Sequence, residues 1–194
     1  MLNLEKGGGL LLTDQETMIR VAGITPESVV DGPGLRAVVF FQGCPHHCPG
    51  CHNPETWDPQ GGKLLTVEEV WRLIRYNPLL SGITLSGGEP LAQPEGALAL
   101  ARKVRAAGGN LMIYTGYTWE EICRFDSPVM TELLGMTALL VDGPFLLAEK
   151  DERLLFRGSR NQRIIDVQAS LGKPAPVLWT PKGGNGDVLG MSGR

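Results

Sequence analysis

The chain has 194 residues, of which 42% are hydrophobic and 20% are charged, and its formal net charge is −3. This length and composition suit one globular domain with a single core, and the slight acidity gives no indication of a nucleic-acid partner. No stretch approaches the roughly 18 consecutive apolar residues of a membrane span, and the N-terminal segment lacks the cleavage site of a signal peptide. We therefore expect a cytoplasmic protein, in which clustered cysteines bind metals more often than they form disulfides.

The first half of the chain predicts strands on either side of a helix. After a loose extension over residues 1–16, apolar runs predict strands at 18–24 and 35–42, the second rich in Val and Phe. Thr66 and Glu69 form a capping box that opens a helix. The apolar residues of this helix share one face (Val67, Val70, Trp71 and Ile74), and a short buried strand follows at 82–86.

The second half repeats the alternation of helix and strand. A helix begins at Pro94, buries Ala97, Leu100, Ala101 and Val104, and ends at the two glycines 108–109. A strand is predicted at 111–115, and a second capping box (Thr118 and Glu121) opens a helix through about 124. Further strands are predicted at 138–141 and 163–167, and residues 173–194 form a tail, rich in Gly and Pro, whose end we expect to be disordered.

Strands that alternate with helices predict βαβ units and a parallel sheet. Five or six strands are too few for a closed eight-stranded barrel. The fold class we expect is therefore α/β, an open partial (β/α) barrel with mostly parallel strands, formed by residues 17–172.

The segment GCPHHCPGCHN, residues 43–53, holds three of the four cysteines and all three histidines. The cysteines Cys44, Cys48 and Cys51 have the spacing C-x3-C-x2-C, whereas a structural zinc site takes four ligands. One of the histidines (His46, His47 or His52) could complete a zinc site. Alternatively, three thiolates could bind a [4Fe–4S] cluster and leave one iron open. Cys123 is expected to be a buried, inert thiol on an amphipathic helix.

The cysteine pattern followed by His52, together with Gly87-Gly88-Glu89-Pro90, resembles the radical S-adenosylmethionine superfamily. The resemblance implies that Cys44, Cys48 and Cys51 bind three irons, while the fourth iron binds the methionine end of S-adenosylmethionine. One electron from the cluster then cleaves the sulfonium and yields a 5′-deoxyadenosyl radical, which abstracts hydrogen from a C–H bond. Histidine replaces the usual aromatic residue at position 52, and its flat ring can still stack near the adenine.

The resemblance also implies a set of cofactor-binding residues. In the Gly-Gly-Glu-Pro segment, the glycines let the backbone approach the ligand and the glutamate offers an acceptor for its ammonium group. By itself this segment could equally be an ordinary turn between a strand and a helix. The expected cofactor-binding residues are Gly50, Cys51, His52, Gly87, Gly88, Glu89 and Thr115.

The segment VDGPGLR before the second strand resembles glycyl-radical activating enzymes. The later segments YTGYTWEE, LLVDGPF and FRGSRNQRIIDV are similar to activating proteins of anaerobic (class III) ribonucleotide reductase. This similarity implies that the substrate is a glycine of that reductase and that a flavodoxin or ferredoxin-like protein donates the electron. The polar residues of these later segments receive no individual role (Asp142, Arg157, Ser159, Asn161, Gln162 and Arg163).

Three alternatives to the reductase activase stay open. The chain could activate another glycyl-radical enzyme, such as pyruvate formate-lyase. It could also act on a small molecule by the same radical chemistry. The third alternative is a non-catalytic module that binds zinc or an iron–sulfur cluster.

Overall fold

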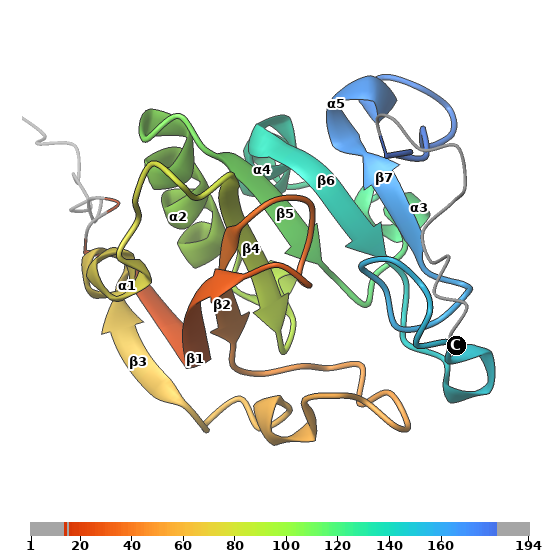
Figure 1. The fold of residues 1–194 in the computed structure, drawn as a ribbon, viewed down its shortest axis with the longest axis horizontal. Helices are drawn as coiled ribbons and strands as arrows, with labels where there is room; N and C mark the ends of the chain where they lie inside the picture. Colours follow the sequence, from red (N-terminus) through yellow and green to blue (C-terminus); the bar gives the residue numbers. More distant parts are fainter. Residues whose placement is uncertain (1–13, 15, 182–194) are drawn as a thin grey trace, which may run out of the picture.

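The computed structural model describes residue 14 and residues 16–181, and the rest of the predicted N-terminal extension and of the tail lies outside them. The described strands form one seven-stranded sheet in the order β3-β1-β2-β4-β5-β6-β7 (Figure 1). Their bounds are β1 Met18–Ser28, β2 Arg36–Phe41, β3 Lys63–Thr66, β4 Gly82–Gly87, β5 Asn110–Tyr114, β6 Thr137–Asp142 and β7 Arg163–Asp166.

The four central strands β2, β4, β5 and β6 are parallel, and antiparallel strands flank them on both sides. β1 pairs antiparallel with β2 and with β3, and β7 pairs antiparallel with β6. The structure confirms the predicted α/β class and the open, incomplete barrel. The sequence did not reveal β3, because its four residues are exposed or half-buried and show no alternation of buried and exposed positions.

The three helices that the sequence analysis predicted begin where their signals lie. Both capping boxes are formed, with Thr66 and Thr118 each exchanging two bonds with the glutamate three residues later. The sequence analysis did not predict the helix α4, which begins after a Ser127 cap, or the short helix α5, which begins at Val167 and so shortens the strand predicted at 163–167. The bounds are α1 Val67–Ile74, α2 Pro94–Ala106, α3 Trp119–Ile122, α4 Pro128–Met136 and α5 Val167–Ser170, with short 3-10 turns η1 Pro54–Thr56, η2 Pro90–Ala92 and η3 Leu147–Glu149.

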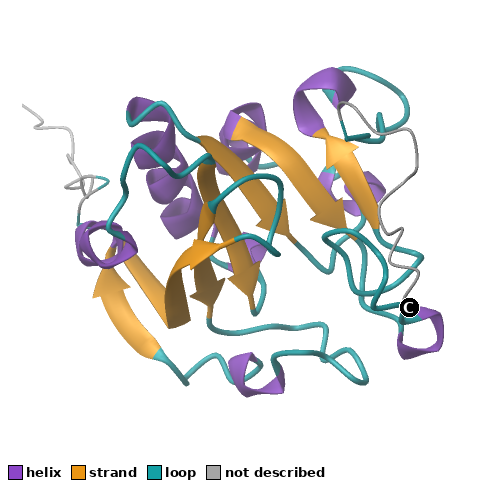
Figure 2. Cartoon of the chain, viewed as in Figure 1, coloured by secondary structure: helices purple, strands orange, loops and turns teal. Residues whose placement is uncertain are grey.

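The main core lies between the sheet and the helices α1, α2 and α4 (Figure 2). Alternation along β5 directs Leu111 and Ile113 toward these helices, whereas Met112 faces a smaller cluster on the opposite side. Trp179 packs against that smaller cluster, and its backbone N–H donates to the carbonyl of Ile164 at 2.8 Å. The described part of the predicted tail therefore packs beside β7, whereas the disorder expected for its end stays a prediction.

The carboxyl ends of the parallel strands all reach the lower edge of the sheet in Figure 1. The long loop from β2 to β3 and the long loop from β6 to β7 run along this edge as well. In open α/β sheets, ligands bind at this edge. No helix in the described part of the chain is long and apolar enough to span a bilayer.

Candidate radical S-adenosylmethionine site

The cysteine-containing loop leaves β2 and is pinned at its base by backbone and side-chain bonds. The N–H of Gly43 donates to the carbonyl of Thr56 at 2.7 Å, and that of Cys44 donates to Trp57 at 3.2 Å. The amide of Gln42 donates to the carbonyls of Glu55 and Asp58 at 3.1 and 2.7 Å. These bonds fix both ends of the segment that carries the three thiols.

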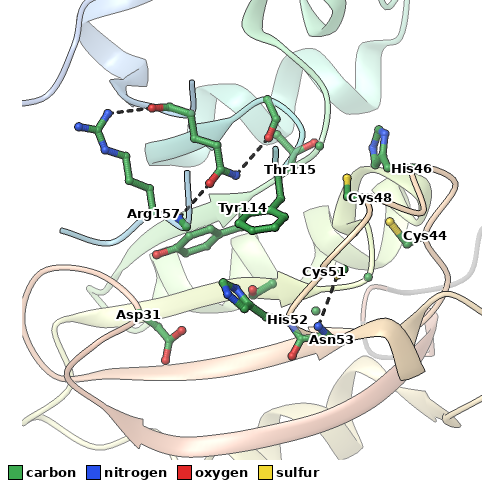
Figure 3. Close-up of a pocket in the computed structure, with 18 of the residues that line it drawn as sticks. Asp31, Cys44, His46, Cys48, Cys51, His52, Asn53, Tyr114, Thr115 and Arg157 are labelled. Atoms are coloured by element: carbon green, nitrogen blue, oxygen red, sulfur yellow. Dashed lines mark hydrogen bonds between the residues drawn. The ribbon is translucent and has the colours of Figure 1, made fainter. Parts of the chain in front are cut away.

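Cys44, Cys48 and Cys51 are half-buried free thiols that line one cavity of about 420 Å³ (Figure 3). This volume lies within the range of about 300–1,000 Å³ that is typical of small-molecule sites. Figure 3 shows Cys44, Cys48 and His46 at one end of the cavity and Arg157 at the other, with His52 and Tyr114 between them. Three soft thiols from one loop, all facing one cavity, fit a cluster that keeps one iron open.

The cavity brings together most of the predicted site residues. Cys51, His52, Gly87, Gly88 and Thr115 line it along with the other two cysteines, whereas Gly50 and Glu89 are not part of the lining. Other lining residues belong to segments that the sequence analysis quoted for their resemblance without assigning them to the site, and several lie beside strand ends (Asp31, Tyr114, Gly116, Gly143, Phe145 and Phe156).

Gly87 and Gly88 are required by the backbone packing of the neighbouring strand. Gly87 has a φ of +90°, and a Cβ atom there would lie 2.7 Å from the Cα of Phe40. A Cβ at Gly88 would lie 2.4 Å from the carbonyl oxygen of Gly43. We expected these glycines to make space for a ligand. The structure gives a second reason for glycine at these positions, because a side chain at Gly88 would push the cysteine loop away from β4.

Glu89 is fully buried next to the cavity, and its carboxylate accepts hydrogen bonds from several segments. It accepts from the backbone of Leu91 at 2.9 Å and of Gly116 at 2.8 Å, and from the Thr115 hydroxyl at 3.0 Å. Its Oε2 atom also lies 2.9 Å from Nε2 of His46. The expected bond from Glu89 to a ligand ammonium group stays a prediction, whereas its bonds across the strand ends are present in the protein.

Burial raises the pKa of the Cys44 thiol, and the nearby charge of Glu89 raises it further, while backbone hydrogen bonds from His46 and His47 lower it. A thiol must lose its proton to bind iron. Binding of a cluster at Cys44 would therefore be coupled to proton release.

The polar residues of β6, β7 and the loop between them mainly hold that loop in place. Asp142 accepts from the N–H of Trp119 at 2.8 Å and from Nε of Arg163 at 3.1 Å. The same Arg163 side chain also donates to Glu120 at 3.0 and 2.7 Å. Hydrogen bonds to the carboxylates also raise the pKa of Arg163, so this guanidinium is committed to joining β6, α3 and β7.

The Arg-Gly-Ser-x-Asn-Gln segment folds over the cavity. Arg157 lines the cavity and donates to the carbonyl of Gln162 at 2.8 Å. The Gln162 side chain accepts from the N–H groups of Gly158 and Ser159 and donates to Gly143. Ser159 is fully buried, and Asn161 donates to the carbonyl of Pro144 at 2.7 Å.

Cys123 differs from the prediction. The expected buried thiol is exposed, because α3 is only four residues long and Cys123 is already its C-terminal cap. The short helix ends before its apolar face can cover this side chain.

A three-thiol loop and a Gly-Gly-Glu turn, brought together at the strand ends of an open α/β barrel, define a radical S-adenosylmethionine protein. Comparison with known proteins agrees, because the family described as "4Fe-4S single cluster domain" matches residues 30–165. The chain belongs to this iron–sulfur family. It is also similar to activating proteins of anaerobic ribonucleoside-triphosphate reductase and of pyruvate formate-lyase.

Individual relatives show how far the similarity extends. The "Anaerobic ribonucleoside-triphosphate reductase-activating protein" of Salmonella typhi is 36% identical over 146 residues, which cover 71% of this chain and 92% of that protein. Its namesake in Escherichia coli K12 is 36% identical over 148 residues, with the same two coverages. The "Pyruvate formate-lyase-activating enzyme" of Clostridium pasteurianum is 42% identical over 125 residues, which cover 60% of this chain and about half (52%) of that protein's length.

Proposed function

We propose that this protein is a glycyl-radical activating enzyme whose substrate is an anaerobic ribonucleotide reductase. The observation that carries the proposal is the meeting of the three cysteines with Gly87, Gly88 and Thr115 around one cavity. The choice of partner is supported by reductase-activating proteins that match this chain over nearly their whole length. We place the catalytic unit at residues 17–172.

The chain's own residues prepare the site for a [4Fe–4S] cluster and S-adenosylmethionine. When bound, this pair supplies reductive cleavage of the sulfonium and the abstraction of a hydrogen atom. Cys44, Cys48 and Cys51 would bind three irons, and the backbone at Gly87 and Gly88 would contact the methionine end. The ring of His52, whose centroid lies 5.2 Å from that of Phe145, borders the same cavity and would contact the nucleoside.

Exposed apolar side chains near the cavity favour a protein substrate over a small molecule. Val29 and Val30, in the loop between β1 and β2, are 70% and 72% exposed, and Val30 lines the cavity. Leu146, Leu147 and Leu155, in the loop between β6 and β7, are also exposed, next to lining residues. Apolar side chains exposed on two loops beside one cavity offer a surface that a protein partner could cover. A glycine of the partner suits the cavity, because it has no side chain to hinder approach to its Cα–H.

The sequence carries one cluster motif, and the electron that reduces the cluster comes from outside it. We propose a flavodoxin or ferredoxin-like donor, by analogy with the family. A cytoplasmic location fits this chemistry, since free thiols persist in a reducing compartment.

The test is an electron paramagnetic resonance spectrum of the reductase from the same source, after anaerobic incubation with the activase, S-adenosylmethionine and a reductant. We expect a glycyl doublet that disappears when the target glycine of the reductase is changed to alanine. A doublet that forms on a pyruvate formate-lyase-type partner and not on the reductase would favour the second candidate, which the Clostridium relative supports. No doublet on either partner, with S-adenosylmethionine cleaved normally, would contradict both.

A further inference from the structure

His46 lies between two cysteines of the loop, and its ring is held in a close-fitting slot at the strand ends. Nε2 is 2.9 Å from Oε2 of Glu89, and the ring meets that of Tyr117 edge-on at 4.5 Å. The slot depends on Gly116, because a Cβ there would lie 2.3 Å from Cδ2 of His46. The side chain of His46 is 17% exposed, and Figure 3 shows it beside Cys44 and Cys48.

The other partner in this contact is held independently of His46. Glu89 follows β4 and also accepts from Leu91 near its own position and from Thr115 and Gly116 after β5. These bonds join the ends of β4 and β5 through the carboxylate, and none of them involves the cysteine loop. Nε2 of His46 lies within hydrogen-bonding distance of this carboxylate, and it donates in the tautomer that carries its proton there.

The neighbouring His47 provides a contrast within the same loop. Its backbone has a φ of +46°, and its ring packs on Trp57 at 5.0 Å. It borders a different, more apolar hollow together with Pro45 and Leu64. Of the two adjacent histidines, only His46 contacts the carboxylate that joins the strand ends.

We infer that His46 is a positioning residue, and that the His46–Glu89 clasp holds the segment from Cys44 to Cys48 against the ends of β4 and β5. The clasp keeps the cluster-binding thiols at a fixed place relative to the Gly87–Gly88 backbone, which lines the same cavity. Such alignment lets a cluster and a bound sulfonium face each other without reorganisation of the loop. The purpose of the alignment rests on the proposed function, whereas the clasp can be tested on the chain alone.

Removal of the clasp should loosen the loop and leave the sheet folded. Glu89 retains its bonds to Leu91, Thr115 and Gly116, so its buried carboxylate stays paired. Two described backbone bonds remain at the ends of this segment, from the N–H of Cys44 to Trp57 at 3.2 Å and from the N–H of Cys51 to Cys48 at 3.0 Å, and neither joins it to the ends of β4 and β5. Local opening of this segment therefore becomes easier at little cost to global stability.

The first experiment uses the cluster-free protein under anaerobic, reducing conditions, with alkylation of each cysteine by iodoacetamide followed by mass spectrometry. His46→Phe keeps a ring in the slot and removes the donor, His46→Gln retains a donor, and His47→Phe is the matched control. We expect Cys44 and Cys48 to react about tenfold faster in His46→Phe, which corresponds to about 1.4 kcal/mol of easier opening. Cys123 is the internal control for the rate of alkylation, because it is exposed and distant in the sequence from the cysteine loop.

The glutamine variant should restore most of the protection, and the urea midpoint of His46→Phe should stay near that of the parent. Parent-like alkylation in His46→Phe, or an equal increase in His47→Phe, would overturn the inference. A global loss of stability in His46→Phe that accounts for the faster alkylation would overturn it too.

The second experiment uses reconstituted protein and separates the clasp from the proposed function. We expect His46→Phe to bind a full cluster but to show a weaker change in the cluster's electron paramagnetic resonance spectrum when S-adenosylmethionine is added, with rescue by His46→Gln. An unchanged spectral response in His46→Phe would overturn the alignment role. If the parent itself gives no such response while the alkylation pattern holds, the proposed function fails and the clasp stands.

Discussion

Replacement of Gly88 by alanine is the smallest change that tests how the cysteine loop is joined to the sheet. The added Cβ would lie 2.4 Å from the carbonyl oxygen of Gly43, 2.9 Å from its carbonyl carbon and 3.1 Å from the carbonyl oxygen of Phe41. All three are backbone atoms, which cannot rotate away as the end of a side chain could. Either β4 or the base of the loop must therefore move.

The expected cost follows from this overpacking. Insertion of a methyl group into a well-packed site typically costs about 1–3 kcal/mol. The displacement also threatens the bond from the N–H of Glu89 to the carbonyl of Gly43, which measures 2.8 Å. One such bond contributes about 0.5–1.5 kcal/mol, so we expect the upper half of the range. For a chain of this size, each 1 kcal/mol lowers the melting temperature by about 2–4 °C.

Gly135→Ala is the matched control, because a Cβ at this position in α4 has no atom within 4 Å. Alanine in a helix is favoured over glycine by about 0.5–1 kcal/mol, so this variant should be slightly more stable than the parent. The assay is urea unfolding of the cluster-free, reduced protein, followed by far-ultraviolet circular dichroism. A Gly88→Ala protein that unfolds at the parent's midpoint, or a Gly135→Ala protein that loses as much stability, would refute the packing argument.

Two further predictions concern the ligands and the helix caps. Replacement of Cys44, Cys48 or Cys51 by alanine should abolish cluster reconstitution, read from visible absorption, whereas Cys123→Ala should retain the full cluster; a full cluster in Cys48→Ala would contradict the ligand assignment. Thr66→Ala should lower the free energy of unfolding by about 1 kcal/mol at neutral pH, because the N-cap bond is lost. The backbone bond from Thr66 lowers the pKa of Glu69, so this stabilisation is present above the ordinary carboxyl pKa and is lost as the pH falls through the lowered value. Unfolding across this acidic range should be less pH-dependent in Glu69→Gln, and an unchanged dependence would contradict the cap's role.

Local signals in the sequence were sufficient wherever structure depends on near neighbours. Both capping boxes involve residues three apart, and the β-branched and aromatic residues of β2 select a strand without reference to the rest of the chain. The spacing of Cys44, Cys48 and Cys51 predicted that one loop would present three thiols. The alternation of strands and helices predicted a parallel sheet, and the resemblance implied that this loop and the Gly-Gly-Glu turn bind the same cofactor.

Contacts between distant segments were decided only by the tertiary structure. Arg36 reads as a polar residue within a strand, yet it is fully buried, donating to Thr84 at 2.7 Å and to Asn110 at 2.8 Å. Burial lowers the pKa of Arg36 to about 10. Thr84 and Asn110 lie 48 and 74 residues away along the chain, so no local sequence pattern predicts these contacts. β3 likewise becomes a strand because β1 supplies its hydrogen bonds, while its own residues give a weak signal.

Glu89 was predicted from a local sequence pattern, but its hydrogen bonds depend on contacts between distant segments. The Gly-Gly-Glu-Pro pattern identified the residue, but its donors come from positions 2, 26, 27 and 43 residues away along the chain. A buried carboxylate must find such donors, because an unpaired charge in the interior is costly. The sequence determined that a carboxylate would stand at the end of this strand. Packing of three separate segments around it decided that it would hold the cysteine loop in place.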